Sequence, residues 1–305
     1  MSMSIDEVKT LKDGYNEFMR IKKIEKLSER TLFTYDTSYI RFTRFTGENI
    51  PCADISQKLI FDFIESLQES NPNIRETSIN SYLRRIRVLL YYCMEQGYIN
   101  QFKITLLKAE KKLKETYTDS ELERLLKKPD TKNCSFAEFR NWATVCYLLG
   151  TGNRLSTLIN VKIGDVDLET REIRLKTVKN KKQYTIPLSN VLEKTLREYL
   201  IFRKGNAEDY LFCSNYGQQL TTDGLSTCIQ KYNHSRGVAK TSIHLFRHTF
   251  AKRWILNGGD AFRLKTILGH STMAMVNEYV NMYGQDLQRD FDNFSPLDNR
   301  PLAKP

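Results

Sequence analysis

Hydrophobic positions recur with helical spacing through the first third of the chain. Two runs show spacings of three and four residues most clearly: Leu32, Tyr35, Tyr39 and Phe42, and then Ile79, Leu83, Ile86 and Leu90. Ser28 is expected to cap the first of these helices, and Gly97 is expected to follow the end of the second. Because “SQKLIFDFIESLQES” between them fits a further helix, the pattern predicts a small helical domain.

The pattern changes in the remainder of the chain. Thr118 and Glu121 have the spacing of a capping box, which indicates that a new helix begins there. Glycines interrupt the helical pattern of “FRNWATVCYLLGTGNRLSTLINV”, and β-branched residues flank “KNKK” in “REIRLKTVKNKKQYTIPLS”, which predicts a β-hairpin. Helical patterns return from about Thr222. The expected fold class is therefore mainly α with a small β-sheet (α+β).

Composition and charge narrow the range of partners. The chain of 305 residues has room for two domains, and Lys plus Arg outnumber Asp plus Glu by 47 to 36. The net charge of +11 favours a polyanion, either nucleic acid or an anionic membrane surface. No apolar run approaches the roughly 18 residues that span a bilayer, and the start lacks the apolar core of a secretory signal, so a cytoplasmic protein is expected. The six cysteines include no Cys-x-x-Cys pair, so we expect neither a metal site nor a disulfide framework.

Several polar residues stand out against this background. Arg154 follows a glycine break in “GTGNRLSTL”, and “SIHLFRH” places His244 and Arg247 on one side of a helix, where both can face an anion. Taken singly, each of these residues is more often structural or ion-paired. Their order along the chain is more specific than any one of them. That order comprises an arginine after a glycine break, a hairpin lysine, His-x-x-Arg, Leu-Gly-His and a later tyrosine: Arg154, Lys179, His244, Arg247, His270 and Tyr279.

In that order and spacing the residues resemble the tyrosine recombinases, the family that includes phage integrases and Xer recombinases. The stretches “YTDSELERLL”, “LINVKIGDVDL” and “LGHSTMAMVNEYVNM” support the resemblance, which covers the whole chain. It implies a helical, SAM-like core-binding domain that binds DNA over residues 1–107 and a linker over residues 108–117. A tyrosine-recombinase catalytic domain with a C-terminal tail would then occupy residues 118–305.

The resemblance implies a site-specific recombinase that cleaves and rejoins DNA without metal, ATP or another cofactor. Tyr279 would attack a phosphodiester, leaving a 3′-phosphotyrosyl link and a free 5′-hydroxyl. Negative charge builds on the nonbridging oxygens during that attack, and Arg154 and Arg247 would meet it with donors that are always charged.

The same reaction also requires protons to move, because a phenol has a pKa near 10 and the leaving 5′-oxygen needs a proton. The resemblance makes Lys179 the general acid for the leaving oxygen. His244 would assist proton transfer from Tyr279 or bond the phosphate, and His270 would bond a phosphate oxygen. His248 has no role in this scheme and is expected to be a structural histidine.

Two departures from the family pattern leave alternatives open. Thr157 stands where the family often has an acidic residue, which puts the usual tuning of the histidine and arginine network in doubt. The hairpin lysine is flanked by Val178 and Asn180 in place of glycine, so Lys181 or Lys182 is an alternative general acid.

Basic residues in both regions are expected to contact the DNA backbone, which supplies most of the affinity in such complexes. They are Arg84, Arg85, Arg87, Lys111 and Lys112. The lysine-rich run of Lys108, Lys111, Lys112 and Lys114 is equally compatible with a solvated surface. The expected partners are double-stranded DNA with specific recombination sites, further protomers that form a tetramer on paired sites, and accessory proteins. The expected location is the cytoplasm, at the nucleoid, without a membrane contact.

Other interpretations remain open at this point. A type IB topoisomerase uses the same nucleophile to relax DNA, and a non-catalytic DNA-binding or architectural protein would retain only the fold. The short helical first domain and “LGHSTMAMVNEY” favour the recombinase. The tail carries Leu287, Phe291 and Phe294, which would either dock on a neighbouring protomer or fold back on their own domain.

Overall fold

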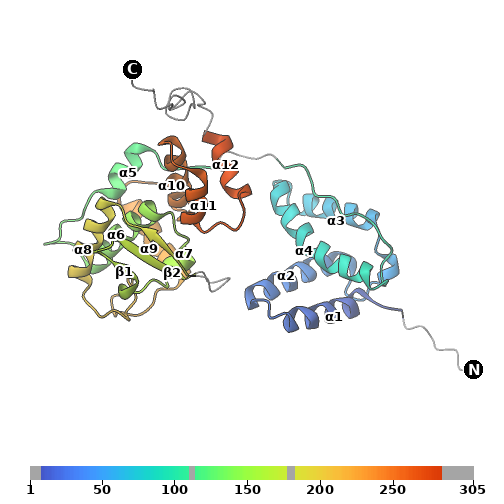
Figure 1. The fold of residues 1–305 in the computed structure, drawn as a ribbon. Helices are drawn as coiled ribbons and strands as arrows, with labels where there is room; N and C mark the ends of the chain where they lie inside the picture. Colours follow the sequence, from blue (N-terminus) through green and yellow to red (C-terminus); the bar gives the residue numbers. More distant parts are fainter. Residues whose placement is uncertain (1–7, 110–113, 177–182, 284–305) are drawn as a thin grey trace, which may run out of the picture. The chain divides into compact units, whose positions relative to one another are not determined.

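The computed structural model describes residues 8–109, 114–176 and 183–283, in two compact units (Figure 1). One unit comprises Met1–Lys112 and the other Leu113–Pro305. Both units are mainly helical and the second contains a small sheet, which confirms the expected α+β class. None of the helices in these described ranges is long and apolar enough to cross a membrane.

The first unit is a helical bundle. Over residues 8–109 its elements are α1 (Leu11–Ile24), α2 (Glu29–Thr46), the 3₁₀ helix η1 (Cys52–Asp54), α3 (Gln57–Ser70) and α4 (Glu76–Glu95). Ser28 caps α2 by accepting a hydrogen bond from the backbone N–H of Thr31, as the sequence predicted. Leu83 and Leu90 are completely buried on α4, which packs against α1 and α2. The helical spacing therefore predicted the core-facing side of α4 correctly.

The second unit combines helices with a three-stranded antiparallel sheet. Its described elements are α5 (Asp119–Leu126), α6 (Phe136–Thr151), α7 (Leu155–Leu158), the 3₁₀ helix η2 (Ile163–Asp165), β1 (Val166–Asp167), β2 (Glu172–Lys176), β3 (Gln183–Pro187), α8 (Asn190–Arg203), α9 (Thr222–Ser235), α10 (His244–Leu256), α11 (Ala261–Leu268) and α12 (Ala274–Tyr283). The sheet order is β1-β2-β3, and Arg174 pairs with Thr185 between β2 and β3. The capping box of Thr118 and Glu121 begins α5. The predicted hairpin is therefore confirmed, while its turn at 177–182 lies outside the described residues.

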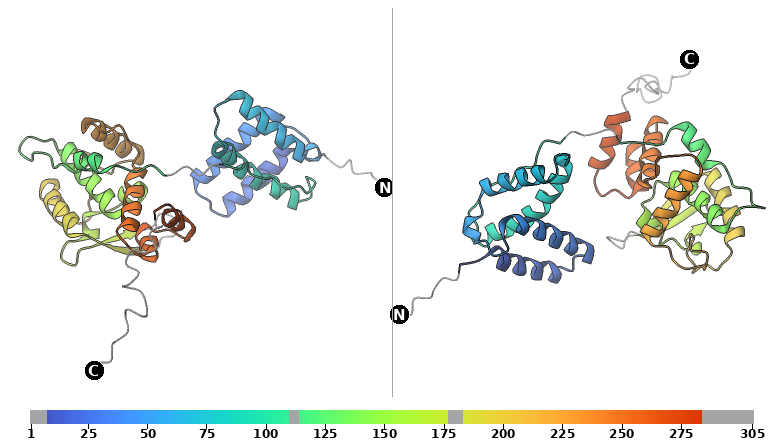
Figure 2. Two further views of the ribbon diagram at one scale, coloured as in Figure 1. Left: turned by 90° about the horizontal axis from the view of Figure 1, so that it is seen from above. Right: turned by 180° about the vertical axis from the view of Figure 1, so that it is seen from behind.

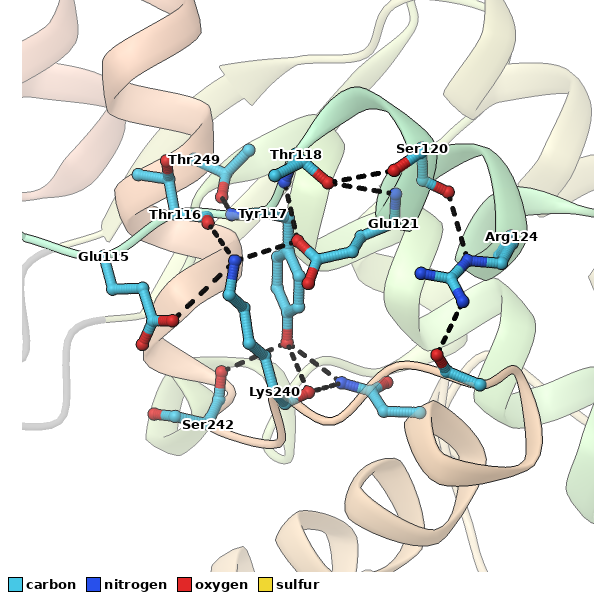
Figure 3. Close-up of polar contacts among 12 residues, drawn as sticks. Glu115, Thr116, Tyr117, Thr118, Ser120, Glu121, Arg124, Lys240, Ser242 and Thr249 are labelled. Atoms are coloured by element: carbon cyan, nitrogen blue, oxygen red, sulfur yellow. Dashed lines mark hydrogen bonds and ion pairs between the residues drawn. The ribbon is translucent and has the colours of Figure 1, made fainter.

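The segment that enters the second unit holds the loop before α10 in place (Figure 3). The backbone N–H of Tyr117 donates to the Thr249 hydroxyl at 2.9 Å, and the Tyr117 ring packs on Phe246 with ring centroids 4.6 Å apart. Lys240 Nζ lies 3.0 Å from the Thr116 carbonyl oxygen and 2.9 Å from the Glu121 carboxylate. These contacts fix α10 at its buried face, where Phe246 belongs to the main core of the unit.

A second, smaller core lies between α10, α11 and α12, which both views of Figure 2 show side by side. Gly152 ends α6 in the left-handed region, with φ of 62°. A Cβ at this position would stand 2.6 Å from the Phe250 ring and 2.7 Å from Leu268, so only glycine permits such a close approach. The glycine break predicted before Arg154 thus brings that arginine to the edge of this second core.

Truncation of Phe246 should destabilise the second unit selectively. Phe246 is fully buried, so Phe246→Ala is expected to lower the free energy of unfolding by about 3–5 kcal/mol. Phe262 on α11 is 69% exposed, and Phe262→Ala should change it by less than about 0.5 kcal/mol. Both tryptophans, Trp142 and Trp254, lie in this unit, so urea denaturation followed by tryptophan fluorescence measures its unfolding. Equal losses in both variants would contradict this assignment of the core.

Candidate active site

Four of the predicted residues gather where α7, α10, α11 and α12 meet. Arg154 immediately precedes α7, Arg247 lies in the first turn of α10, His270 follows α11, and Tyr279 lies on α12. Arg247 is the common point of this group: its guanidinium contacts the His270 ring at Nε2, and its pKa responds to both Arg154 and Tyr279. These four residues, which were selected from their order in the sequence, therefore form a single cluster in space.

Backbone carbonyl groups hold the two arginines. Arg247 donates from Nη1 to the Gly152 oxygen at 2.9 Å and from Nη2 to the Leu268 oxygen at 2.8 Å. Arg154 donates from Nη1 to the Gly269 oxygen at 3.2 Å. Gly269 has a φ of 60° and ends α11 in the left-handed region, as the predicted break requires. Each guanidinium is thus oriented by the end of a neighbouring helix.

The electrostatic balance of this cluster favours an anion. Arg247 is only 7% exposed, and burial, followed by the nearby charge of Arg154, lowers its pKa to about 10, so it remains charged at neutral pH. Neither arginine forms an ion pair with a carboxylate among the residues that the structure describes. A buried, unpaired cation is costly, and an anion placed between Arg247 and the partly buried Arg154 relieves both that cost and their mutual repulsion.

His270 offers a further donor to such an anion. Burial, with Arg247 and Arg154 next in importance, lowers its pKa to about 4, so the ring is neutral at pH 7. Because Nε2 accepts from Arg247, the proton of the neutral ring belongs on Nδ1. That Nδ1 is buried and has no hydrogen-bond partner among the described residues. An oriented but unused donor of this kind fits a phosphate oxygen.

Tyr279 is buried and held from two sides. It is 2% exposed, and its hydroxyl oxygen lies 2.6 Å from Nδ1 of His248. Burial raises the pKa of its phenol, and the charge of Arg247 opposes this shift. On the other side, Lys114 Nζ stands 4.6 Å from the centre of the Tyr279 ring and forms an ion pair of 2.5 Å with Glu278.

The other predicted catalytic residues are either exposed or lie outside the described part of the chain. His244 is the exposed first residue of α10, and its imidazole makes no hydrogen bond with any described residue. Lys179 and its alternatives Lys181 and Lys182 lie outside the described residues. Tyr184 on β3 follows that segment closely. Burial raises the pKa of its phenol, and the charges of Arg247 and Arg154 oppose this shift. The hairpin strand β3 therefore begins beside the two arginines.

The predicted DNA contacts in the first unit lie on α4. Arg84 is exposed, while Arg85 and Arg87 are partly buried, and the Arg87 guanidinium lies 5.9 Å from the centre of the Tyr91 ring. Lys111 and Lys112 lie outside the described residues. Thr157, where the resemblance led us to expect an acidic residue, is partly buried on α7.

Sequence reasoning missed two contacts of Tyr279. His248 was expected to be merely structural, although it follows His244 by four residues and therefore lies on the same side of α10. That spacing was the available signal. Lys114 was interpreted only as part of a lysine-rich run, and nothing in its local sequence indicates a contact with α12.

Comparison with known proteins supplies the family. The model of the phage integrase family matches residues 115–285, and that of the phage integrase SAM-like domain matches residues 10–113. Tyrosine recombinase XerD of Oceanobacillus iheyensis is 25% identical over 301 residues, which cover 94% of this chain and 99% of the relative. Tyrosine recombinase XerD of Staphylococcus haemolyticus is 27% identical over 301 residues, covering 95% and 99% respectively.

Solved structures share the fold. The integrase of transposon Tn1549, in complex with a circular intermediate DNA, matches with a TM-score of 0.75 at 18% identity, over 94% of this chain and 99% of that one. XerH recombinase bound to a palindromic difH substrate matches with a TM-score of 0.70 at 22% identity, over 90% and 82%. Together with the family models, these matches confirm the resemblance seen in the sequence. The chain belongs to the phage integrase family and is a tyrosine recombinase.

The low pKa of His270 predicts a pH-dependent stability. An unfolded histidine has a pKa near 6.5, so between about pH 6.5 and 4 the unfolded chain takes up a proton that folded His270 does not. The free energy of unfolding of the second unit should therefore fall as the pH is lowered through this range. His270→Asn should reduce that dependence and leave the part that His248 contributes, whereas His234→Asn, at an exposed position on α9, should leave all of it. Urea titrations across this pH range would contradict the assignment if the two variants had equal slopes.

Proposed function

We propose that the chain is a site-specific recombinase that cleaves and rejoins double-stranded DNA through a covalent bond between Tyr279 and a 3′-phosphate. The observation that carries this proposal is a pair of arginines, Arg247 buried and Arg154 partly buried, which have no carboxylate partner among the described residues and lie beside a buried phenol. A phosphodiester supplies the anion that this cluster lacks, and the phenol supplies the nucleophile. Family membership supports the same chemistry.

The reaction follows from these positions. The Tyr279 oxygen bonds to phosphorus while the bond from phosphorus to the 5′-oxygen breaks, which leaves a 3′-phosphotyrosyl link and a 5′-hydroxyl. Arg154, Arg247 and the Nδ1–H of His270 stabilise the charge on the nonbridging oxygens. The bond energy is kept in the phosphotyrosyl link, so attack by a 5′-hydroxyl reverses the reaction and rejoins the strand.

The proposed substrate requires several protomers. Two exchanges on two duplexes call for four active tyrosines, hence a tetramer on paired sites. A lambda integrase tetramer bound to a Holliday junction, with a TM-score of 0.71, supports this arrangement for the fold. The first unit would add phosphate contacts through Arg84, Arg85 and Arg87, and the linker would add Lys111 and Lys112. We infer that the enzyme acts in the cytoplasm, at the nucleoid.

The other interpretations have less support. Recombinases match both units of the chain, since the XerD relatives cover 94–95% of it, which favours recombination over topoisomerase-like relaxation. A purely architectural protein would not need two unpaired arginines beside a buried tyrosine.

Replacement of Tyr279 by phenylalanine separates binding from chemistry. Tyr279→Phe removes the nucleophilic oxygen and little volume, so DNA binding should be retained while the covalent adduct is lost completely. Gel shifts measure binding, and denaturing gels with nicked suicide duplexes detect the adduct. Tyr283→Phe, which changes a neighbouring tyrosine on α12, is the matched control and should still form the adduct. An adduct in Tyr279→Phe would refute the assignment.

Substrate chemistry can identify the general acid among the hairpin lysines. A substrate with sulfur in place of the bridging 5′-oxygen has a leaving group that needs no proton. Alanine at the lysine that acts as general acid should lower cleavage of the normal substrate by about 10²–10⁴-fold and leave cleavage of the sulfur substrate near that of the unmodified protein. We expect this result for Lys179→Ala and not for Lys181→Ala or Lys182→Ala. Rescue of one of the latter two would move the role to that lysine.

A further inference from the structure

The hydrogen bond between His248 and the Tyr279 hydroxyl has no part in the reaction proposed above. Nδ1 of His248 lies 2.6 Å from the Tyr279 hydroxyl oxygen, although 31 positions separate the two residues in sequence. The rings are tilted by 46°, with centroids 5.9 Å apart, so they meet through this polar contact and are not stacked. His248 is partly buried, and Tyr279 is almost completely so.

His248 is better placed than His244 to act on this oxygen. His244 is exposed at the start of α10, and its imidazole makes no hydrogen bond with any described residue. His248 lies one turn further along the same helix, next to Arg247, and is already in contact with the atom that must lose a proton. Of the protein groups in the described part of the chain, only His248 is recorded within hydrogen-bond distance of the Tyr279 hydroxyl.

We propose that His248 is a catalytic residue that holds the Tyr279 hydroxyl through Nδ1 and takes up its proton during attack on DNA. The step rests on the proposed function and balances in a simple way. The O–H bond of Tyr279 breaks and its proton moves to Nδ1, while the oxygen–phosphorus bond forms and the 5′-oxygen leaves with a proton from the hairpin lysine. During rejoining, Nδ1 returns the proton to Tyr279.

The surroundings of His248 make this role dependent on DNA. Five titratable or charged groups face the ring, from the entering segment, from α10 and from α12: Lys114, His244, Arg247, Glu278 and Tyr279. Burial, followed by Lys114, His244 and Arg247, lowers the pKa of His248 to about 4 in the DNA-free protein, so the ring is neutral and a weak base. A bound phosphodiester offsets the nearby positive charges and thereby raises the pKa of His248. The substrate itself would thus make His248 a better proton acceptor.

His248→Asn tests this proposal, because its amide oxygen can occupy the position of Nδ1 and accept a hydrogen bond, but the amide cannot take up the proton. The measurement is the single-turnover rate of adduct formation on nicked duplexes, with DNA affinity measured in parallel. We expect unchanged affinity and a rate at least about 100-fold lower at pH 7. Between pH 7 and 9 the rate of the variant should rise roughly tenfold per pH unit, because hydroxide must then remove a proton from a phenol of high pKa. His234→Asn is the matched control and should behave like the unmodified protein.

Two further measurements distinguish proton transfer from other roles. The sulfur-bridged substrate should not rescue His248→Asn, because His248 acts on the nucleophile and not on the leaving group. A fluorinated tyrosine at position 279, which has a more acidic phenol, should restore part of the rate in His248→Asn. Tryptophan fluorescence verifies that the variant is folded.

Other results would overturn the proposal. A rate within threefold of the unmodified protein would show that His248 is dispensable, and a lower rate with an unchanged pH profile would reduce it to a positioning residue. Rescue by the sulfur substrate would assign it to the leaving group. In each of these cases the unmodified protein still forms an adduct through Tyr279, so failure of the His248 proposal is distinct from failure of the proposed function.

Discussion

The second unit depends on the way in which Arg247 is buried. Its guanidinium joins the end of α6 through the Gly152 oxygen, the end of α11 through the Leu268 oxygen, and His270 beyond α11. A buried cation is usually paired with a carboxylate, but here neutral groups orient the charge and leave it available. The same hydrogen bonds therefore hold three segments of the fold together and create a positively charged site. Stability and chemistry at this point rest on one side chain.

Tyr279 is placed by a second set of contacts. His248 lies at its hydroxyl, Lys114 lies over its ring, and the smaller core between α10, α11 and α12 surrounds it. Lys114 belongs to the segment that enters the second unit, and it is also ion-paired with Glu278 on α12. The helix that carries Tyr279 is consequently tied both to the helix that carries Arg247 and to the start of its own unit. These contacts keep the phenol protected in the DNA-free protein.

Much of the fold was predictable because its signals are local. The helical spacing at Leu83 and Leu90, the capping box at Thr118 and the hairpin around “KNKK” each depend on residues close in sequence. The cluster of Arg154, Arg247, His270 and Tyr279 was predictable only from the order of motifs, since no local pattern indicates that four separate elements meet. The contacts of His248 and Lys114 with Tyr279 were not predictable, because they depend on how α10 and the entering segment pack against α12.

In the proposed reaction, the buried phenol beside the unpaired arginines is the group that bonds to DNA. The most direct test is to trap the protein on nicked duplexes taken from the DNA that flanks its own gene, digest the trapped complex, and identify the nucleotide-linked residue by mass spectrometry. We expect a single linkage, through Tyr279, at one defined sequence. Linkage through any other of the 16 tyrosines, or tight binding without any covalent linkage, would contradict it.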